Sequence, residues 1–243
     1  MNRIASRLLA AAVTGAIALP AGVTAAAGQE TGQFPASAVP VVKKWIDFLH
    51  DGKSWKAWQL MGRASKERIG SFEQFKSEKS AWATGWGAWA TAQRRTFTVG
   101  SIASSDTEEV SAVTVTGRVK REGPYRRDAA AVPVITRGGA SKVEPLASPA
   151  RIRFIKPAFK DTVGANAIFR ARIDGIGREN TVEMTIKNGQ TATASLEKTG
   201  DHEWIATARF ARPLVEGQHV VTLTLIRRAG VAAKAIPFTV DAG

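Results

Sequence analysis

Residues 45–89 read WIDFLHDGKSWKAWQLMGRASKERIGSFEQFKSEKSAWATGWGAW, and this stretch decides how the N-terminal part of the 243-residue chain folds. It contains six of the seven tryptophans of the chain. A buried tryptophan removes roughly 150–250 Å² from water, which contributes on the order of 4–6 kcal/mol per ring as an upper bound. We therefore expect the first folded part of the protein to be built on this tryptophan-rich stretch.

The chain begins with the features of an export signal. Arg3 and Arg7 precede a twelve-residue apolar run, LLAAAVTGAIAL (residues 8–19), which Pro20 ends. Twelve residues are short of the ~20 that a membrane-spanning helix needs, although a retained anchor stays open as the alternative. Small alanines follow, so residues 1–27 are predicted to be a signal peptide and the mature protein to be extracytoplasmic, in the periplasm or cell wall, without a transmembrane segment.

Composition and net charge limit the kinds of site and partner that the chain can have. The chain has no cysteine, which excludes disulfides and thiolate metal sites. The formal net charge is +13, and loss of Arg3 and Arg7 with the leader leaves +11. A basic chain outside the cytoplasm favours an anionic envelope polymer or lipid headgroups over nucleic acid as its partner, and another envelope protein stays open as an alternative partner. The alternative is that the basic charge serves solubility alone.

After a linker at residues 28–36, helical and then alternating periodicity predicts an α+β domain over residues 37–147. Hydrophobic spacing and capping residues indicate three helices, which begin near positions 37, 54 and 71. Four strands are expected at residues 95–102, 110–120, 127–136 and 142–146. In the second strand, Val113 and Val115 would face the core, whereas Thr114 and Thr116 would face water.

Residues 148–243 show a different pattern. A small-residue segment with a proline at residues 147–149 marks the predicted boundary between the two domains. Beyond it, seven short alternating segments are separated by turn residues, among them the hairpin pair Asn188 and Gly189. Many short strands in fewer than a hundred residues are typical of a β-sandwich.

The N-terminal part resembles a known superfamily. Its first helices read AVPVVKKWIDFLHDGKSWKAWQLM (residues 38–61), and a capping-box helix, SFEQFKSEKSAW (residues 71–82), precedes the sheet. This order resembles the nuclear transport factor 2-like superfamily. The resemblance implies an α+β cone, in which three helices lie on a curved antiparallel sheet. In secreted members, such as the N-terminal domain of resistance-type penicillin-binding transpeptidases, this domain is a non-catalytic spacer or docking module.

The C-terminal part resembles a bacterial immunoglobulin-like domain. The segment EGQHVVTL (residues 216–223) is similar to the strand entry at which such domains carry a corner tyrosine. His219 takes that position here, which implies a structural, hydrogen-bonding role for this histidine. The expected fold class is therefore the α+β cone followed by an all-β immunoglobulin-like sandwich.

The sequence contains few groups suited to catalysis. Its three histidines are far apart, and no HExxH, GxSxG, SxxK or phosphate-loop motif is present. Asp47 and His50 share a helical face and could act as an acid–base pair, although a helix C-terminus also gives His50 a structural role. The cluster at residues 201–203 lies in a predicted turn and is interpreted as solvated. We therefore predict no catalytic residue, no metal and no cofactor.

Two groups of residues are candidates for binding. Aromatic side chains that could line a pocket are Trp82, Trp86, Trp89 and Tyr125. Basic side chains that could contact an anionic surface are Arg118, Lys120, Arg121, Arg126 and Arg127. The sequence predicts an exported, non-enzymatic cell-envelope binding or docking protein. The alternatives are a small-molecule-binding or enzymatic cone that uses the tryptophan-lined pocket, and a purely structural spacer.

Overall fold

In the computed structural model, the residues described are 38–77, 86–104 (backbone only for 101–104), 108–120, 123–146, 150–176, 180–186, 189–227 and 230–241. They contain five helices, which are α1 (Ala38–His50), α2 (Ser54–Leu60), α3 (Arg63–Ile69), α4 (Phe72–Ser77) and α6 (Ala88–Ala90). No helix in these ranges is long and apolar enough to cross a membrane.

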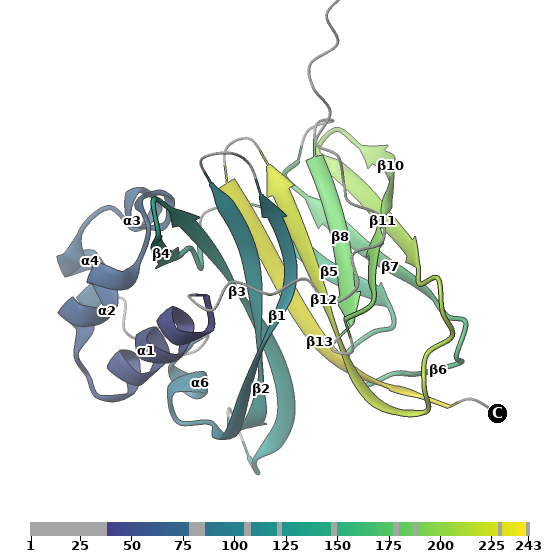
Figure 1. Ribbon diagram of the computed structural model, residues 1–243, viewed down its shortest axis with the longest axis horizontal. Helices are drawn as coiled ribbons and strands as arrows, with labels where there is room; N and C mark the ends of the chain where they lie inside the picture. Colours follow the sequence, from purple (N-terminus) through teal and green to yellow (C-terminus); the bar gives the residue numbers. More distant parts are fainter. Residues whose placement is uncertain are drawn as a thin grey trace, which may run out of the picture. The chain divides into compact units, whose positions relative to one another are not determined.

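The helices form a layer on one face of a first sheet, sheet A (Figure 1). In α1, Val42, Trp45 and Ile46 recur at helical spacing and are buried in the core shared with this sheet. The helices are short because glycines interrupt the chain. Gly52 and Gly70 have φ angles of +69° and +96°, and this left-handed region ends a helix at little cost only for glycine.

Sheet A consists of four antiparallel strands in the order β1-β2-β3-β4. Their bounds are β1 (Gln93–Ser104), β2 (Glu109–Val119), β3 (Arg126–Arg137) and β4 (Ala140–Val143). Val113 and Val115 on β2 face the helices, as the alternation predicts. The prediction that Thr114 and Thr116 face water is wrong, because these side chains are only 3% and 6% exposed. Another sheet covers this second face of sheet A.

The C-terminal half is β-rich and consists of two sheets that share one core. Sheet B has the order β10-β11-β7-β5, with bounds β5 (Arg151–Lys156), β7 (Ile168–Asp174), β10 (Ser195–Gly200) and β11 (Glu203–Arg209). Sheet C has the order β6-β13-β12-β8-β9, with bounds β6 (Thr162–Val163), β8 (Asn180–Ile186), β9 (Thr191–Thr193), β12 (Gly217–Arg227) and β13 (Gly230–Val240). The strands β6 and β13 pair in parallel, and the other neighbours are antiparallel.

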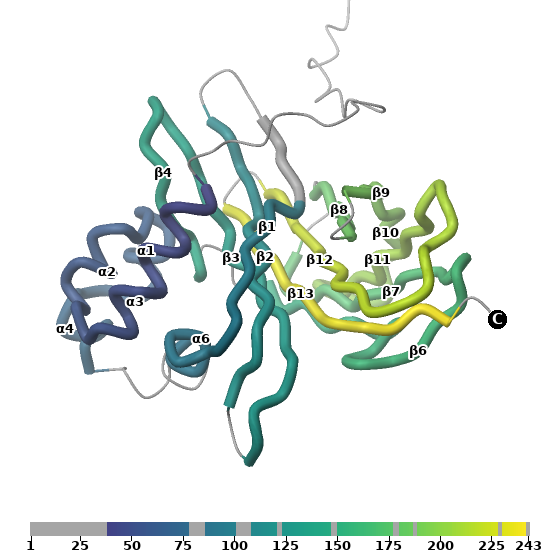
Figure 2. The backbone as a smooth tube through the Cα atoms, turned by 60° about the horizontal axis from the view of Figure 1, so that its bottom comes forward, coloured from purple at the N-terminus to yellow at the C-terminus, as the bar shows by residue number. Residues whose placement is uncertain are grey.

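Sheet C also packs on sheet A through small side chains. Ala129 and Ala131 of β3 form a buried cluster with Val220 of β12 and Ala235 of β13. Beside this cluster, the hydroxyl group of Thr114 is hydrogen-bonded to that of Thr222. The backbone tubes of β3 and β13 run close together in Figure 2 as well. Alanines and threonines suit this interface because short side chains let two sheets approach closely.

The predicted fold class, a three-helix α+β cone followed by a sandwich, is therefore wrong. The described chain is mostly β, with three sheets and five short helices, and no three-helix cone on a sheet is evident. Two physical causes account for the difference. An additional helix, α3, forms between the second and third expected helices, and sheet C covers the face of sheet A that was expected to be solvated. The predicted boundary at residues 147–149 lies outside the described residues and stays a prediction.

A buried carboxylate connects the helices to the end of sheet A. The side chain of Glu144, which follows β4, is 4% exposed. Its Oε2 atom accepts a hydrogen bond of 2.8 Å from the backbone N–H of Ser65, in the first turn of α3. The hydroxyl of Ser65 in turn accepts a 3.0 Å hydrogen bond from the N–H of Leu146. Glu144 thus satisfies one of the free N–H groups of α3, where a negative charge also complements the helix dipole.

Candidate functional site

The tryptophans proposed as pocket walls are largely part of the core. Trp89 is buried, and half-buried Trp86 packs edge-on against buried Trp45 with ring centroids 5.3 Å apart. Such edge-on packing is a favourable arrangement for aromatic rings in a core. Trp82 lies outside the described residues. Tyr125 lies on the β2–β3 hairpin and is half-buried.

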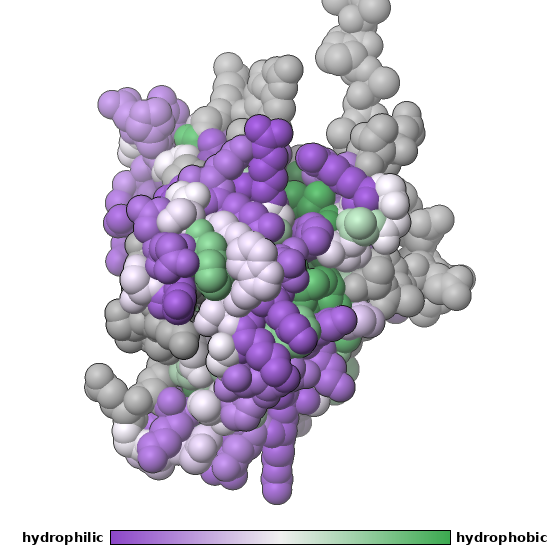
Figure 3. All heavy atoms as spheres, turned by 90° about the vertical axis from the view of Figure 1, so that its left-hand side faces the viewer, coloured by the Kyte–Doolittle hydropathy of each residue, from purple (hydrophilic) through white to green (hydrophobic). Residues whose placement is uncertain are grey.

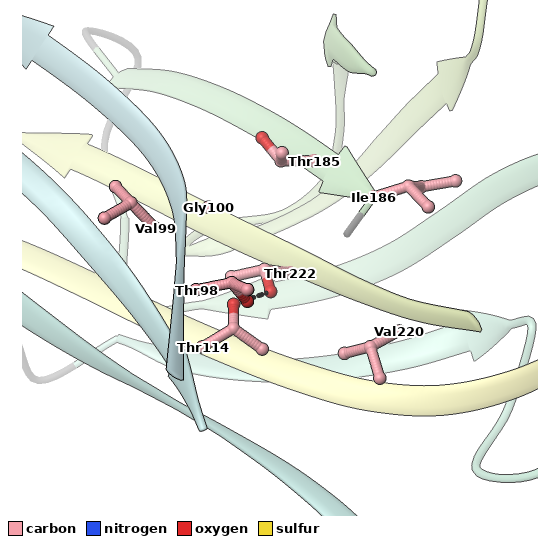
Figure 4. Close-up of a pocket in the computed structure, with 8 residues that line it drawn as sticks. All are labelled: Thr98, Val99, Gly100, Thr114, Thr185, Ile186, Val220 and Thr222. Atoms are coloured by element: carbon pink, nitrogen blue, oxygen red, sulfur yellow. Dashed lines mark hydrogen bonds between the residues drawn. The ribbon is translucent and has the colours of Figure 1, made fainter. Parts of the chain in front are cut away.

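Two cavities among the described residues lie away from these rings. The first has a volume of about 10 Å³ and is enclosed by β1, β2, β8 and β12, with Thr98, Thr114, Thr185 and Thr222 on its walls (Figure 4). It has room for about one water molecule. The second, about 230 Å³, is lined by Pro145, Leu146, Ala150, Ile152, Val231, Ala232, Ala233 and Lys234. Trp86, Trp89 and Tyr125 line neither cavity.

Asp47 and His50 are not brought together as an acid–base pair. Asp47 instead accepts a 2.9 Å hydrogen bond from the guanidinium group of Arg95 on β1, whereas His50 is exposed at the end of α1. The Nε2–H group of His219 donates a hydrogen bond to the backbone carbonyl oxygen of Val215, 2.6 Å away, in keeping with the structural role expected of this histidine. The described residues contain no group of three or more side chains that could hold a metal ion.

The predicted basic residues of the β2–β3 hairpin are exposed, with Arg121 lying outside the described residues. Arg118 and Arg127 stand directly opposite each other on the two strands. Arg127 also donates a hydrogen bond to the side-chain oxygen of Gln218 on β12, which ties it to sheet C. Arg126 and Lys120 complete the described part of this basic patch.

A second basic surface, which the sequence analysis did not identify, covers the outer face of sheet B. Along β5 and β7, alternate residues enter the core and the residues between them face outward. The strand register places Arg153 opposite Arg172 and Lys156 opposite Arg170. Like charges directly opposite each other destabilise a sheet. The outward basic residues, here called the basic face, are Arg151, Arg153, Lys156, Arg170, Arg172 and Arg209.

Carboxylates neutralise only one end of the basic face. Arg172 donates a 3.0 Å hydrogen bond to Asp174 and another to Glu203, and Asp174 also lies opposite Arg151. The other basic residues of the face form no ion pair with any described residue; they are Arg153, Lys156, Arg170 and Arg209. The positive charge is therefore concentrated toward the end of the face where Lys156 and Arg170 lie.

The helical layer, which faces the viewer in Figure 3, is also largely hydrophilic. Several of its cations contact a carboxylate or an aromatic ring. Lys53 pairs with Asp51 at 2.7 Å, and Arg63 pairs with Glu67. The ammonium group of Lys66 lies 5.4 Å from the ring centre of Trp58, and burial lowers the pKa of this lysine. Lys43, Arg68 and Lys76 of this layer form no ion pair with a described residue, so unpaired cations are not confined to the basic face.

A pattern in the sequence could have revealed the basic face. The segments RIRF (residues 151–154) and FRARID (residues 169–174) each carry two arginines at a spacing of two within a predicted strand. A spacing of two places both side chains on the same face of a strand. What the sequence does not contain is the pairing of these two strands as neighbours, which brings the two pairs of arginines together.

No protein family and no curated protein matches this chain. Among solved structures, the endo-beta-1,4-mannanase from Thermotoga petrophila aligns with 14% identity and a TM-score of 0.30, over 40% of this chain and 20% of that chain. The titin Ig tandem domains A164-A165 align with 10% identity and a TM-score of 0.24, over 61% of this chain and 100% of that chain. The chain thus spans about a fifth of the mannanase chain. Similarities at this level support no conclusion about activity.

Proposed function

We propose that the protein is an exported, non-enzymatic docking protein of the cell envelope, which binds an anionic envelope polymer through the basic face of sheet B. The observation that carries the proposal is the cross-strand pair of Lys156 and Arg170, which has no carboxylate partner among the described residues. An arrangement that opposes sheet stability is expected mainly where it serves a function. A bound polyanion would relieve the repulsion between these two cations.

The immunoglobulin-like resemblance of residues 148–243 fits this proposal. The basic face is the outer surface of a sheet whose inner surface is the sandwich core, so its side chains are held on a regular, hydrogen-bonded scaffold. Exposed charges of this kind attract a partner over about 8–10 Å at physiological salt. Binding should therefore weaken as salt concentration rises.

Retention of the exported protein on a heparin resin and on isolated cell envelopes tests the proposal. The double variant Lys156→Glu/Arg170→Glu should elute at lower salt than the unchanged protein, and its retention on envelopes at low salt should fall by about tenfold or more. A matched control, Lys43→Glu/Arg68→Glu, makes the same change of charge at exposed positions of the helical layer. Equal losses in the two variants would show that net charge, and not the basic face, governs retention.

A further inference from the structure

Three large apolar side chains are exposed beside the unpaired cations of the basic face. Ile155 is 44% exposed, Ile168 is 41% exposed and Phe159 is 51% exposed, and they are three of the five such side chains in the described chain. Single exposed apolar residues are ordinary at protein surfaces. A group of them among unpaired cations is less ordinary and indicates an interaction surface.

The strand register explains why these side chains gather. An irregularity in the pairing of β5 with β7, between Phe154 and Lys156, leaves both Ile155 and Lys156 exposed. Lys156 lies opposite Arg170, and Ile168 is two residues from Arg170 on the same face of β7. Ile168 in turn lies opposite Arg209 of β11. Isoleucines and cations therefore alternate over the same end of sheet B.

The loop that follows β5 carries Phe159, three residues after Lys156 in the chain. Hydrogen bonds fix the loop: the N–H of Ala158 donates to the carboxylate of Asp161 at 2.7 Å, and the N–H of Lys160 donates to the carbonyl oxygen of Pro237 at 2.9 Å. Phe159 therefore stays exposed on a loop anchored to β13. The ammonium group of Lys160 lies 5.1 Å from the centre of the Phe159 ring, which adds another cation beside an exposed apolar group.

We propose that this end of the sandwich, here called the amphipathic end, docks on a membrane surface of anionic phospholipid. It consists of Ile155, Lys156, Phe159, Lys160, Ile168, Arg170 and Arg209. The inference rests on the proposed function and adds an anionic lipid surface as a second anionic partner, at this end of the basic face. Cations alone would suit any polyanion. Burial of the exposed isoleucines and the phenylalanine contributes binding free energy only where an apolar phase lies beneath the charges. A membrane has this arrangement, because its charged headgroups lie above its acyl chains.

Vesicle binding of the exported protein tests this assignment. The vesicles contain phosphatidylglycerol and phosphatidylcholine at 30:70, or phosphatidylcholine alone, and heparin serves as a soluble polyanion without an apolar phase. The unchanged protein should bind the anionic vesicles about tenfold or more tightly than the neutral ones. The variant Ile155→Ser/Phe159→Ser/Ile168→Ser should lose about tenfold in affinity for anionic vesicles and keep its affinity for heparin.

Two further variants separate the contribution of the charged side chains to binding from that of the apolar side chains. Lys156→Glu/Arg170→Glu should weaken binding to both vesicles and heparin. Val215→Ser removes an apolar side chain that is even more exposed, at 69%, from a different loop, and should change binding to neither. All substituted side chains are exposed, and unchanged thermal melting would show that the fold is intact.

The possible results distinguish failure of the lipid assignment from failure of the proposed function. Vesicle binding that survives the triple serine substitution would overturn the lipid assignment, because the apolar side chains would then contribute nothing. Binding to heparin and isolated envelopes without binding to anionic vesicles would also overturn it, and would leave the proposed anionic polymer in place. Failure to bind heparin, envelopes and vesicles alike would overturn the proposed function itself.

Discussion

Truncation of Glu144 to alanine should destabilise the protein, although this residue lies in no candidate binding surface. Its carboxylate is almost fully buried and accepts the backbone N–H of Ser65 at 2.8 Å. Removing the carboxylate leaves that N–H without its partner in the first turn of α3. A buried donor left unsatisfied costs about 1–3 kcal/mol, and loss of the negative charge near the helix N-terminus adds in the same direction.

Gly62 lies beside the side chain of Glu144 and allows a second test of this prediction. A Cβ atom added at Gly62 would lie 1.9 Å from Oε1 of Glu144, so Gly62→Ala forces the carboxylate to move away from Ser65. Gly62→Ala should therefore cost about as much as Glu144→Ala itself. In a Glu144→Ala background the obstacle is gone, and Gly62→Ala should cost only the ~1 kcal/mol or less expected of alanine at an N-cap. The two substitutions should thus be non-additive by about 1 kcal/mol or more.

Urea denaturation of the two single variants and the double variant measures these differences in the free energy of unfolding. Glu67→Ala is the matched control, because Glu67 forms an exposed ion pair with Arg63 within one helix and its removal should cost less than about 0.5 kcal/mol. Additive effects of Gly62→Ala and Glu144→Ala, or a loss below about 0.5 kcal/mol for Glu144→Ala, would refute the proposed role of the buried carboxylate.

Three further predictions concern the core, the interface between sheets and pH. Trp45→Ala should lower the free energy of unfolding by about 3–5 kcal/mol in urea, since Trp45 is fully buried; a loss below about 1 kcal/mol would contradict its place in the core. Thr114→Val removes the buried hydrogen bond to Thr222 and should cost about 1–3 kcal/mol in the same assay. Burial raises the pKa of Glu183 above its ordinary value of 4.5, so the folded state binds the proton more tightly than the unfolded state. This residue therefore makes the free energy of unfolding fall as pH rises through and above 4.5. Glu183→Gln should flatten the dependence of melting temperature on pH in that range, and an unchanged profile would contradict this prediction.

Local sequence patterns predicted the elements better than their arrangement. The helical spacing of Val42, Trp45 and Ile46 is visible in the sequence, and these residues do form one buried face of α1. By contrast, residues 63–69 lie between the second and third expected helices and were assigned to neither, yet they form α3. The hydrogen bond that caps this helix comes from Glu144, 79 residues from Ser65, and no local pattern contains that contact.

Local patterns also could not predict what covers each face of sheet A or which residues meet at the candidate site. Alternation along β2 indicates that Thr114 and Val115 point to opposite sides, but it does not say what covers each side. Threonine is equally suited to a solvated face and to a close contact between sheets, so the packing of β2 and β3 on sheet C could not be predicted. Likewise, the outward arginines of β5 and β7 were visible as a pattern, whereas their cross-strand pairing depends on strand order.

The contact between sheets A and C also determines which basic residues give an interpretable binding experiment. Arg127 of the β2–β3 hairpin is hydrogen-bonded to Gln218 of β12, so reversing its charge would disturb this contact as well as the exposed surface. A loss of binding in Arg127→Glu would therefore have two explanations. Lys156 and Arg170 avoid this ambiguity, because they project from the outer face of sheet B and form no ion pair with a described residue. Their reversal changes the charge presented to a partner and leaves both the sandwich core and the contact between sheets in place, which is why the proposed function rests on these two residues.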